Sequence, residues 1–361
     1  MAEIRNIHQM QVAAARENSI GNEVLALRAA LRLWGYHSEI YAAEVAPSMR
    51  GQATHFERYR PSPHDLLILH YSTGSELTDY VRALGVPLVL VYHNVTPARF
   101  MTGLGTAEKE RARRGREQLA SLSQQTVLAL ADSDYNLQEL RALGFEHAQV
   151  LPVLVTDVLE QVQPDERVLA RFDHGAGWDD LLFVGRVVPN KRQEDLIKLL
   201  YFYRQIKPRS RLFLVGSWSN TRRYAAWLQQ FARRLGLADA VYLCGHVSIP
   251  ALAAYYRLAD VFVCMSEHEG FGIPLVEAMR LGVPVLAYAS TAVPETMGGA
   301  GVLIREKRFA VVAELVRVLL EDAGLRQRII ARQRTRARTF EPAAVIAAFR
   351  ASLEQAIGRV E

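Results

Sequence analysis

Runs of apolar residues alternate along the chain with stretches whose apolar positions recur every three to four residues. A short apolar run is typical of a buried strand, and the 3.6-residue period is typical of an amphipathic helix. The strand-like runs form two series. The first comprises residues 65–70, 87–92 and 126–130, and the second comprises residues 181–184, 211–215, 241–243, 260–265 and 283–288. Strands that alternate with helices predict parallel sheets made of βαβ units, so the fold class is α/β.

The two series predict two domains. Residues 157–180 lie between them and contain several acids, Pro164, Gly175 and Gly177, a composition that indicates a linker. We expect one domain over residues 1–160 and a second over residues 176–340. A chain of 361 residues is too long for one ordinary core, which agrees with this division.

Composition indicates a folded protein. The chain is 50% hydrophobic and 22% charged, which excludes a disordered chain. Cys244 and Cys264 each lie in an apolar run, which favours reduced core thiols over a disulfide or a metal site. No apolar run approaches the roughly 18 residues of a membrane span. Residues 1–5 lack a signal-peptide core, so we expect a cytoplasmic location.

Two carboxylates stand eight positions apart beside a predicted strand end. Glu269 follows the strand at residues 260–265, and Glu277 lies about two turns into the next predicted helix. Gly270 and Gly272 between them allow backbone N–H groups to approach an anion. Such carboxylates accept hydrogen bonds from sugar hydroxyls. The alternative is a first-turn acid favoured by the helix dipole and a solvated helix residue.

Two cations follow another predicted strand. Arg186 comes directly after residues 181–184 and Gly185, and Lys191 lies five positions further on. Cations at a strand-to-helix turn can neutralise a departing diphosphate. The alternative is that they are ordinary surface cations at a loop end.

The segment at residues 266–279 resembles the E-x7-E signature of the family four retaining glycosyltransferases, which have the GT-B fold. Glu269 and Glu277 match its two acids, and Gly185, Arg186 and Lys191 match the G-R-x-x-x-x-K pattern of that family. In the family the first acid contacts the donor sugar, the second contacts the ribose, and the two cations bind the diphosphate. The resemblance implies a donor site formed by Gly185, Arg186, Lys191, Gly216, Ser217, Val247, Glu269, Gly270, Phe271, Gly272, Ile273, Leu275 and Glu277.

The resemblance also implies two Rossmann-like domains that face a central cleft, with a last helix at about 341–361 packed back on the first domain. His93 follows the strand at 87–92, where similar enzymes place a histidine that faces donor sugar and acceptor. The alternative is an exposed histidine that caps a loop. His70 and the residues after it are expected to line the acceptor side. The loop at residues 17–23 has one glycine, Gly21, where many relatives have two.

The activity implied is transfer of a hexose from a nucleoside diphosphate sugar, GDP- or UDP-linked, to a hydroxyl of a glycan, glycolipid or small molecule with retention. Catalytic roles fall to His93, Glu269, Arg186 and Lys191, without a metal or bound cofactor. The leaving phosphate helps to deprotonate the acceptor. Analogy with mannosyltransferase loops favours GDP-mannose.

A second acidic motif, Asp132-Ser133-Asp134, has the D-x-D pattern by which another glycosyltransferase fold binds metal. Helix capping explains these residue types equally well, because residues 135–143 have a helical pattern and Ser133 or Asp134 can serve as the N-cap. We therefore expect no metal here.

Net charge is +5 with a pI near 9.2, which predicts an anionic partner. Arginines at 111–116 are interleaved with glutamates, which favours a solvated helix face. Phe100, Met101 and Leu104 lie beside them, so peripheral attachment at the inner face of the membrane is the alternative. Six arginines between residues 326 and 338 mark another helix. No aromatic interleaving or known module accompanies these clusters, so we expect no nucleic-acid partner.

Two functions other than glycosyl transfer are compatible with a site for a nucleoside diphosphate sugar. A non-catalytic nucleotide-sugar sensor is expected to lose some of the four charged residues, and all four are present. A sugar-nucleotide epimerase of the same fold needs acids and a histidine in a different pattern.

Overall fold

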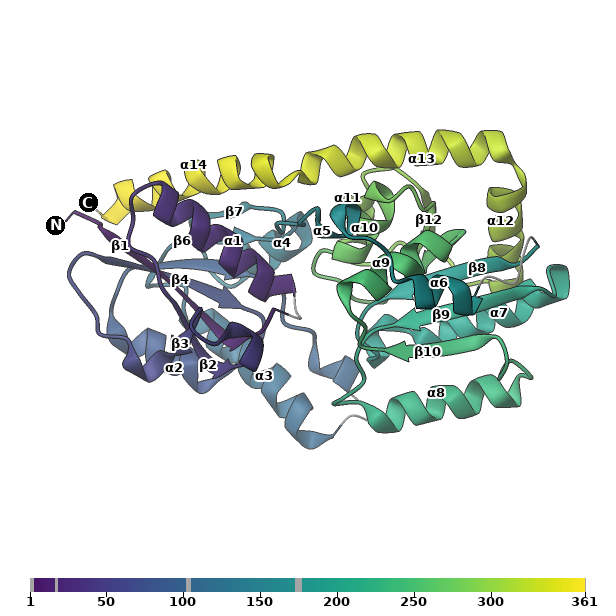
Figure 1. The fold of residues 1–361 in the computed structure, drawn as a ribbon. Coiled ribbons are helices and arrows are strands. Elements are labelled where there is room, and N and C mark those ends of the chain that lie inside the picture. Colours follow the sequence, from purple (N-terminus) through teal and green to yellow (C-terminus); the bar gives the residue numbers. More distant parts are fainter. Residues whose placement is uncertain (1–2, 17–18, 102–104, 173–176, 361) are drawn as a thin grey trace. The chain divides into compact units, whose positions relative to one another are not determined.

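The computed structural model describes residues 3–16, 19–101, 105–172 and 177–360. Glu17, Asn18, Leu104 and Gly175, which belong to segments discussed above, lie outside the described residues. The chain forms two compact units (Figure 1). Of the described residues, unit 1 comprises those within Met1–Met101, Gly105–Val155 and Phe340–Glu361, and unit 2 comprises those within Thr156–Thr339.

Unit 1 is built on a seven-stranded parallel sheet of order β3-β2-β1-β4-β5-β6-β7. Its strands are β1 (Asn6–Ala14), β2 (Ile40–Val45), β3 (Thr54–His55), β4 (Asp65–Tyr71), β5 (Leu88–Tyr92), β6 (Thr126–Ala131) and β7 (Ala148–Val150). Its helices are α1 (Ser19–Leu33), α2 (Glu76–Leu84), α3 (Thr106–Ser121), α4 (Asp134–Ala142) and α14 (Pro342–Val360), with short 3-10 turns η1 (Pro47–Met49), η2 (Phe56–Arg58) and η3 (Ala98–Met101). The three predicted strands of the first series are therefore confirmed as β4, β5 and β6.

Both faces of this sheet are covered, as a parallel sheet requires. Successive residues of β4 point to opposite faces, so Leu67 and Leu69 join one apolar cluster while Leu66 and Ile68 join the other. Helix α14 adds residues with helical spacing to the second cluster, among them Val345, Phe349 and Leu353. The C-terminal helix therefore packs against the sheet of unit 1.

Strand β1 was not predicted, and the reason lies in its composition. His8, Gln9 and Gln11 interrupt its apolar residues, yet all three are almost fully buried. Buried polar side chains remove the apolar run by which a central strand is recognised. A strand that departs from the expected apolar pattern is often part of a functional or strained site. The buried polar residues of β1 therefore indicate such a site in unit 1.

Unit 2 is built on a six-stranded parallel sheet of order β10-β9-β8-β11-β12-β13. Its strands are β8 (Asp179–Val184), β9 (Ser210–Val215), β10 (Val241–Gly245), β11 (Val261–Cys264), β12 (Val285–Tyr288) and β13 (Val302–Ile304). Its helices are α5 (Val158–Gln161), α6 (Glu166–Phe172), α7 (Gln193–Ile206), α8 (Arg222–Arg234), α9 (Ile249–Leu258), α10 (Ile273–Arg280), α11 (Val293–Met297), α12 (Phe309–Glu321) and α13 (Ala323–Ala337), with the 3-10 turn η4 (Pro189–Lys191); a further turn, η5 (Arg338–Phe340), precedes α14.

The interpretation of residues 157–180 as a linker is wrong. They contain α5 and α6 and the start of β8, and they belong to unit 2. Phe172 at the end of α6 is buried, and its ring packs against Phe213 and Tyr242 at centroid distances of 4.8 and 5.1 Å. Pro164 thus lies between two short helices, α5 and α6, and not in an extended linker.

Candidate functional site

The residues assigned to the donor by sequence follow four neighbouring strands of unit 2. Their positions are Gly185, Arg186 and Lys191 after β8, Gly216 and Ser217 after β9, Val247 after β10, and Glu269 to Glu277 after β11. Because β10, β9, β8 and β11 are parallel neighbours, their carboxyl ends meet at one edge of the sheet. Open α/β sheets bind ligands at this edge, which we call the donor edge.

Backbone contacts join the donor edge into one surface. The N–H of Gly185 donates to Val215 O at 2.9 Å, and the N–H of Gly216 donates to Gly245 O at 2.9 Å. A Cβ atom on Gly216 would lie 2.0 Å from Gly185 O, and the residue has a φ of 150°. Only glycine allows the chain to pass here, so the loops after β8 and β9 are fixed against each other.

Lys191 and Glu269 meet at the donor edge. Lys191 is the last residue of η4, and its Nζ forms an ion pair with Oε2 of Glu269, 78 residues further along the chain. Both side chains are partly accessible, at 20% and 11%. Arg186 as a residue is exposed, although partial burial of its guanidinium lowers its pKa, and that group has no ion-pair partner in the part of the chain that the structure describes. One cation is therefore held by a carboxylate while the other remains open to an anion.

Asn190 attaches the loop after β11 to the loop after β8. Its Nδ2 donates to His268 O at 3.1 Å, and the N–H of Glu267 donates to Asn190 O at 2.8 Å. Asn190 is almost fully buried. These two bonds set the distance across which Lys191 reaches Glu269.

Thr291 holds the backbone of Glu269 from the other side. Its Oγ1 accepts from the N–H of Glu269 at 2.8 Å and donates to the carbonyl of Glu269 at 2.8 Å. The residue adopts a φ of 43°, which is rare for a β-branched side chain. Strain of this kind persists only where the surroundings impose it and is concentrated at functional sites. Sequence reasoning missed both Asn190 and Thr291.

Glu277 lies on α10, which begins after Gly272, a residue with a φ of 97°. Its Oε2 accepts a hydrogen bond from the hydroxyl of Tyr256 at 2.7 Å. Burial raises the pKa of Glu277 above its usual range, while the bond from Tyr256 acts in the opposite direction. The interpretation of Glu277 as a solvated helix residue is therefore wrong. Phe271 is buried, and its carbonyl accepts from Thr296 Oγ1 at 2.6 Å.

A network of charged side chains holds the loop after β11, which contains Glu267 and Glu269. Lys307 Nζ lies 2.9 Å from Asp195 Oδ2 and 3.2 Å from Glu267 Oε1. Burial alone would raise the pKa of Asp195, but hydrogen bonds from Lys198 and Lys307 hold it below its ordinary value. Lys307 is 112 residues from Asp195, so no local pattern in the sequence could have identified this contact.

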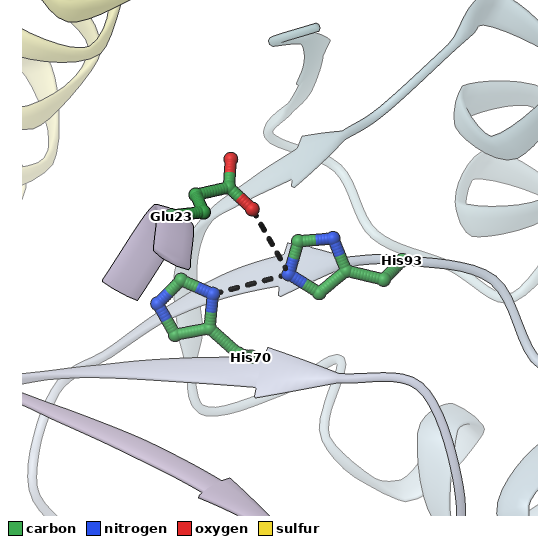
Figure 2. Close-up of side chains that lie close together, drawn as sticks. All are labelled: Glu23, His70 and His93. Atoms are coloured by element: carbon green, nitrogen blue, oxygen red, sulfur yellow. Dashed lines mark hydrogen bonds and ion pairs between the residues drawn. The ribbon is translucent and has the colours of Figure 1, made fainter. Parts of the chain in front are cut away.

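Unit 1 contains a second polar site, which we call the acid–histidine cluster and define as Glu23, His70, His93 and Asp132. They come from α1, β4, the residue after β5 and the residue after β6. His93 Nε2 lies 3.1 Å from His70 Nδ1 and 3.6 Å from Glu23 Oε2 (Figure 2). His93 Nδ1 lies 3.1 Å from both carboxylate oxygens of Asp132. The side chain of His93 is 4% exposed, so the alternative of an exposed loop histidine is wrong.

Burial and charge shift the ionisation of these groups in opposite directions. Burial alone would lower the pKa of His93, but Asp132 and Glu23 raise it to about 9. Burial raises the pKa of Glu23 to about 7. Burial, followed by the charge of His93, lowers the pKa of His70 well below its usual value. Sequence reasoning assigned neither Glu23 nor Asp132 to a site with His93.

Glu23, His70 and His93 have ligand atoms within 4.8 Å of one another, a spacing that allows a metal ion. The orientation of the rings argues against one. The two ring centroids are 5.4 Å apart, about the largest separation that a 3.1 Å nitrogen–nitrogen distance permits, so the nitrogens point at each other. A zinc ion between nitrogens so directed needs about 4 Å between them. A hydrogen bond fits this geometry, and the absence of a metal stays a prediction.

The D-x-D motif divides between two roles. Ser133 is the N-cap of α4, and its side chain accepts from the N–H of Asn136 at 3.2 Å, which confirms the capping prediction. Asp134 lies exposed in the first turn of that helix. Asp132 points instead to His93, a contact that the capping interpretation did not include.

The basic helix α3 pairs its arginines with acids. Arg113 bonds Glu110 and Glu117, and Arg114 bonds Asp79 at 2.7 Å, all on exposed side chains. These contacts are those of a solvated helix face. Cys244 and Cys264 are both free thiols, the first half-buried and the second buried. Among the described residues, no helix has the length and apolar character needed to cross a membrane.

Comparisons with known proteins agree with the architecture. The model of the family described as Glycosyl transferases group 1 matches residues 171–336. A D-inositol 3-phosphate glycosyltransferase of Nocardiopsis dassonvillei is 33% identical over 298 residues, which cover 78% of this chain and 68% of that protein. One of Geodermatophilus obscurus is 30% identical over 292 residues, covering 77% of this chain and 63% of the relative. The chain thus spans about two thirds of the length of these relatives.

Solved structures share both units. A sucrose-phosphate synthase from Thermosynechococcus elongatus superposes with a TM-score of 0.77 at 18% identity, covering 97% of this chain and 99% of that chain. Anabaena HepE in complex with UDP-glucose gives a TM-score of 0.76 at 17% identity, with the same coverage. These likenesses confirm the predicted α/β fold of two Rossmann-like parallel-sheet domains.

Proposed function

Because the chain belongs to the group 1 glycosyl transferases and has the GT-B fold, we propose that it transfers a hexose from a nucleoside diphosphate sugar to an acceptor hydroxyl with retention at the anomeric carbon. The observation that carries this proposal is the donor edge. There Lys191 and the exposed Arg186 lie on the loop after β8, and Lys191 pairs with Glu269 on the loop after the adjacent strand β11. Donor binding is assigned to residues 176–340 and the acceptor side to residues 1–160.

The ion pair suggests how donor binding proceeds. A diphosphate offers more negative charge than one carboxylate, so Lys191 exchanges Glu269 for phosphate oxygens, and Arg186 joins it. The released carboxylate of Glu269 then accepts hydrogen bonds from hydroxyls of the sugar. Both cations stabilise charge that develops on the leaving diphosphate, and such preorganised groups lower the barrier.

In the proposed transfer step, no covalent intermediate forms on the enzyme. The bond from the anomeric carbon to the diphosphate oxygen breaks, and a bond to the acceptor oxygen forms on the same face of the sugar. The acceptor's proton passes to the leaving phosphate. Glu277, whose carboxylate is held by Tyr256, is assigned to the ribose of the donor.

Donor and acceptor identity are the finer part of the proposal. A uridine or guanosine diphosphate hexose is expected as donor; HepE is described in complex with UDP-glucose, and the loop analogy favours GDP-mannose. The relatives are described as D-inositol 3-phosphate glycosyltransferases, so inositol phosphates belong in the acceptor panel beside glycans and glycolipids. A metal-independent reaction, a cytoplasmic location and contact with the inner membrane face stay predictions.

A product analysis tests the proposal. Purified protein is incubated with UDP- and GDP-hexoses and an acceptor panel in the presence of a chelator, and the anomeric configuration of any product is read by proton NMR. We expect one donor to give a product with the donor's anomeric configuration. Lys191→Ala is expected to abolish it, whereas Lys207→Ala, an exposed lysine of unit 2 that pairs with Glu321, retains it.

Other outcomes separate the alternatives. Donor binding without product for any acceptor favours the nucleotide-sugar sensor. Conversion of the donor to its epimer, or to free sugar and nucleoside diphosphate with inversion at the epimerised carbon, favours the epimerase. An inverted anomeric centre in a transfer product contradicts the proposed mechanism.

A further inference from the structure

The hydrogen bonds around His70 have a fixed direction. The side-chain amide of Gln9 donates through Nε2 to the carbonyl of Val24 at 3.0 Å, so its Oε1 faces His70 Nε2, also at 3.0 Å. An amide oxygen can only accept. His70 Nε2 must therefore carry a proton and donate it to Gln9.

One proton lies on the line between the two histidines. His70 Nδ1 and His93 Nε2 are 3.1 Å apart and point at each other, with ring planes 8° apart. Two lone pairs in this position would repel, so one of the two nitrogens is a donor. Because His70 already carries a proton on Nε2, a proton on its Nδ1 would make His70 the cation.

The partners on the far side show which ring carries the charge. His93 Nδ1 faces both oxygens of Asp132 at 3.1 Å, and a carboxylate accepts there, so this nitrogen also bears a proton. Two carboxyl groups, from Asp132 and Glu23, lie within 3.6 Å of His93, whereas the second nitrogen of His70 faces a neutral amide. A cation is stabilised on the ring that the carboxylates face.

We propose that His93 is an imidazolium throughout the neutral range, held by a one-way chain of hydrogen bonds in which Asp132, His70 and Gln9 are positioning residues. The charge state stands on the geometry of unit 1 alone; its use in transfer rests on the function proposed above. There His93 supplies a fixed positive charge at the carboxyl end of β5. It is not the base that takes the acceptor's proton, because neither ring nitrogen has a free lone pair.

The groups that face His93 come from every element around it: Glu23 on α1, His70 on β4 and Asp132 after β6. Oε1 of Glu23 accepts from the N–H of Leu154 at 3.2 Å, while Oε2 has no hydrogen-bond partner among the described residues and lies 3.6 Å from His93 Nε2. Glu23 is thus a second counter-charge where it is ionised, above its raised pKa of about 7, and Asp132 is the first. The pKa of His93 is raised and that of His70 is lowered, as this arrangement requires. Burial raises the pKa of Asp132, while the charge of His93 and the hydrogen bond between the two groups oppose that shift.

The test is a nitrogen-15 NMR measurement on the whole chain labelled in histidine, without any substrate. Long-range proton–nitrogen correlations distinguish an imidazolium, whose two nitrogens have similar shifts, from a neutral ring, whose nitrogens differ widely. The chain has 10 histidines. An ordinary histidine, with a pKa of about 6.5, is neutral at pH 8. We expect one charged ring at pH 8, and one ring that stays neutral with its proton on Nε2 down to pH 5.5.

The charged ring is assigned as the signal that is lost in His93→Asn, and the neutral ring as the signal that is lost in His70→Asn. No charged ring at pH 8 in the native protein overturns the proposal without recourse to any variant, as does a charged ring that belongs to His70. Because the spectrum is recorded on free protein, this failure is separate from failure of the glycosyl-transfer assay. The positioning role adds one expectation: Asp132→Asn converts the charged ring at pH 8 to a neutral one, while Asp134→Asn, two positions away, leaves it charged.

Discussion

The donor edge of unit 2 and the acid–histidine cluster of unit 1 hold charge in different ways. At the donor edge, Lys191 and Glu269 are 20% and 11% exposed and pair with each other. In the cluster, the side chains of His93 and Glu23 are 4% and 2% exposed, and a chain of hydrogen bonds fixes His93 on both sides. An accessible ion pair can be opened by a ligand, whereas a buried network keeps its charge in place.

This difference assigns the two regions to different tasks. In the proposed function, the donor edge exchanges a protein carboxylate for a substrate diphosphate, so its residues would move between partners during turnover. The cluster, with His93 charged as proposed, would offer a charge that needs no reorganisation when the reaction occurs. Variants of the donor edge should therefore abolish binding and transfer together, while variants of the cluster should change the rate and its pH dependence.

The largest expected effect is at the donor edge. Lys191→Ala and Glu269→Gln should each lower the rate of transfer by about 10²- to 10³-fold, because each removes a charged group that acts on the diphosphate or the sugar. Steady-state kinetics and circular dichroism check activity and folding together. Lys207→Ala is the matched control on an exposed helix-end lysine. Transfer at the native rate in either variant would refute the site assignment.

A smaller effect is expected in the cluster. Asp132→Asn should lower kcat by about tenfold to a hundredfold through loss of the charge on His93, with little change in the KM for the donor. Asp134→Asn, exposed in the first turn of α4, should behave as the native protein. A change confined to KM would place Asp132 in substrate binding and contradict its positioning role.

Thr291 positions the backbone of Glu269, the residue that exchanges partners in the proposed function, through two hydrogen bonds. Thr291→Val keeps the branched shape but removes both bonds to Glu269. Each bond contributes about 0.5–1.5 kcal/mol. We expect the free energy of unfolding to fall by about 1–3 kcal/mol and the transfer rate by about tenfold. Chemical denaturation and kinetics of Thr291→Ser supply the control, since serine retains the hydroxyl; equal losses in both variants would exclude the hydrogen bonds as the cause.

The smallest expected effect is on stability as a function of pH. The pKa of His93 is raised from 6.5 to about 9 on folding, so its contribution is complete below pH 6.5 and is lost as pH rises to 9. The pKa of Glu23 is raised from 4.5 to about 7 by burial, so the folded state is favoured by the protonated carboxyl and loses stability between these values. Stability is therefore expected to fall as pH rises, through Glu23 between pH 4.5 and 7 and through His93 between pH 6.5 and 9.

Calorimetric unfolding between pH 6 and 9 checks this prediction, with an expected fall in Tm of a few degrees. Glu23→Gln should remove the part of the fall below pH 7, and His93→Gln the part above it. A Tm that rises over this range in the native protein would contradict the ionisation states assigned to the cluster.

The same contrast explains how much of the molecule could be predicted from sequence. The donor edge is encoded in short segments, since Arg186 and Lys191 lie five positions apart and Glu269 and Glu277 eight. Parallel strands then bring these segments to one edge, and the predicted strands sufficed to place them. The residues that were missed, Asn190 and Thr291, act through backbone contacts that no residue pattern reports.

The acid–histidine cluster could not be predicted from local sequence patterns, for a different reason. Its acids lie on α1 and after β6, and Gln9, which sets the direction of its hydrogen bonds, lies on a strand that was not predicted. Asp132 was considered only as part of a metal or capping motif. Buried polar groups remove the apolar signal of the strand that carries them, so the region where strand prediction failed is also the region with the unusual chemistry.

The central claim is that the donor edge binds a nucleoside diphosphate through Lys191 and Arg186 without a metal. Calorimetric titration of UDP and GDP into the native protein and Lys191→Ala, both in the presence of a chelator, tests it most directly. The account predicts micromolar binding of one of the two nucleotides to the native protein and its loss in the variant. Absence of binding to the native protein, or equal binding to both proteins, would contradict it.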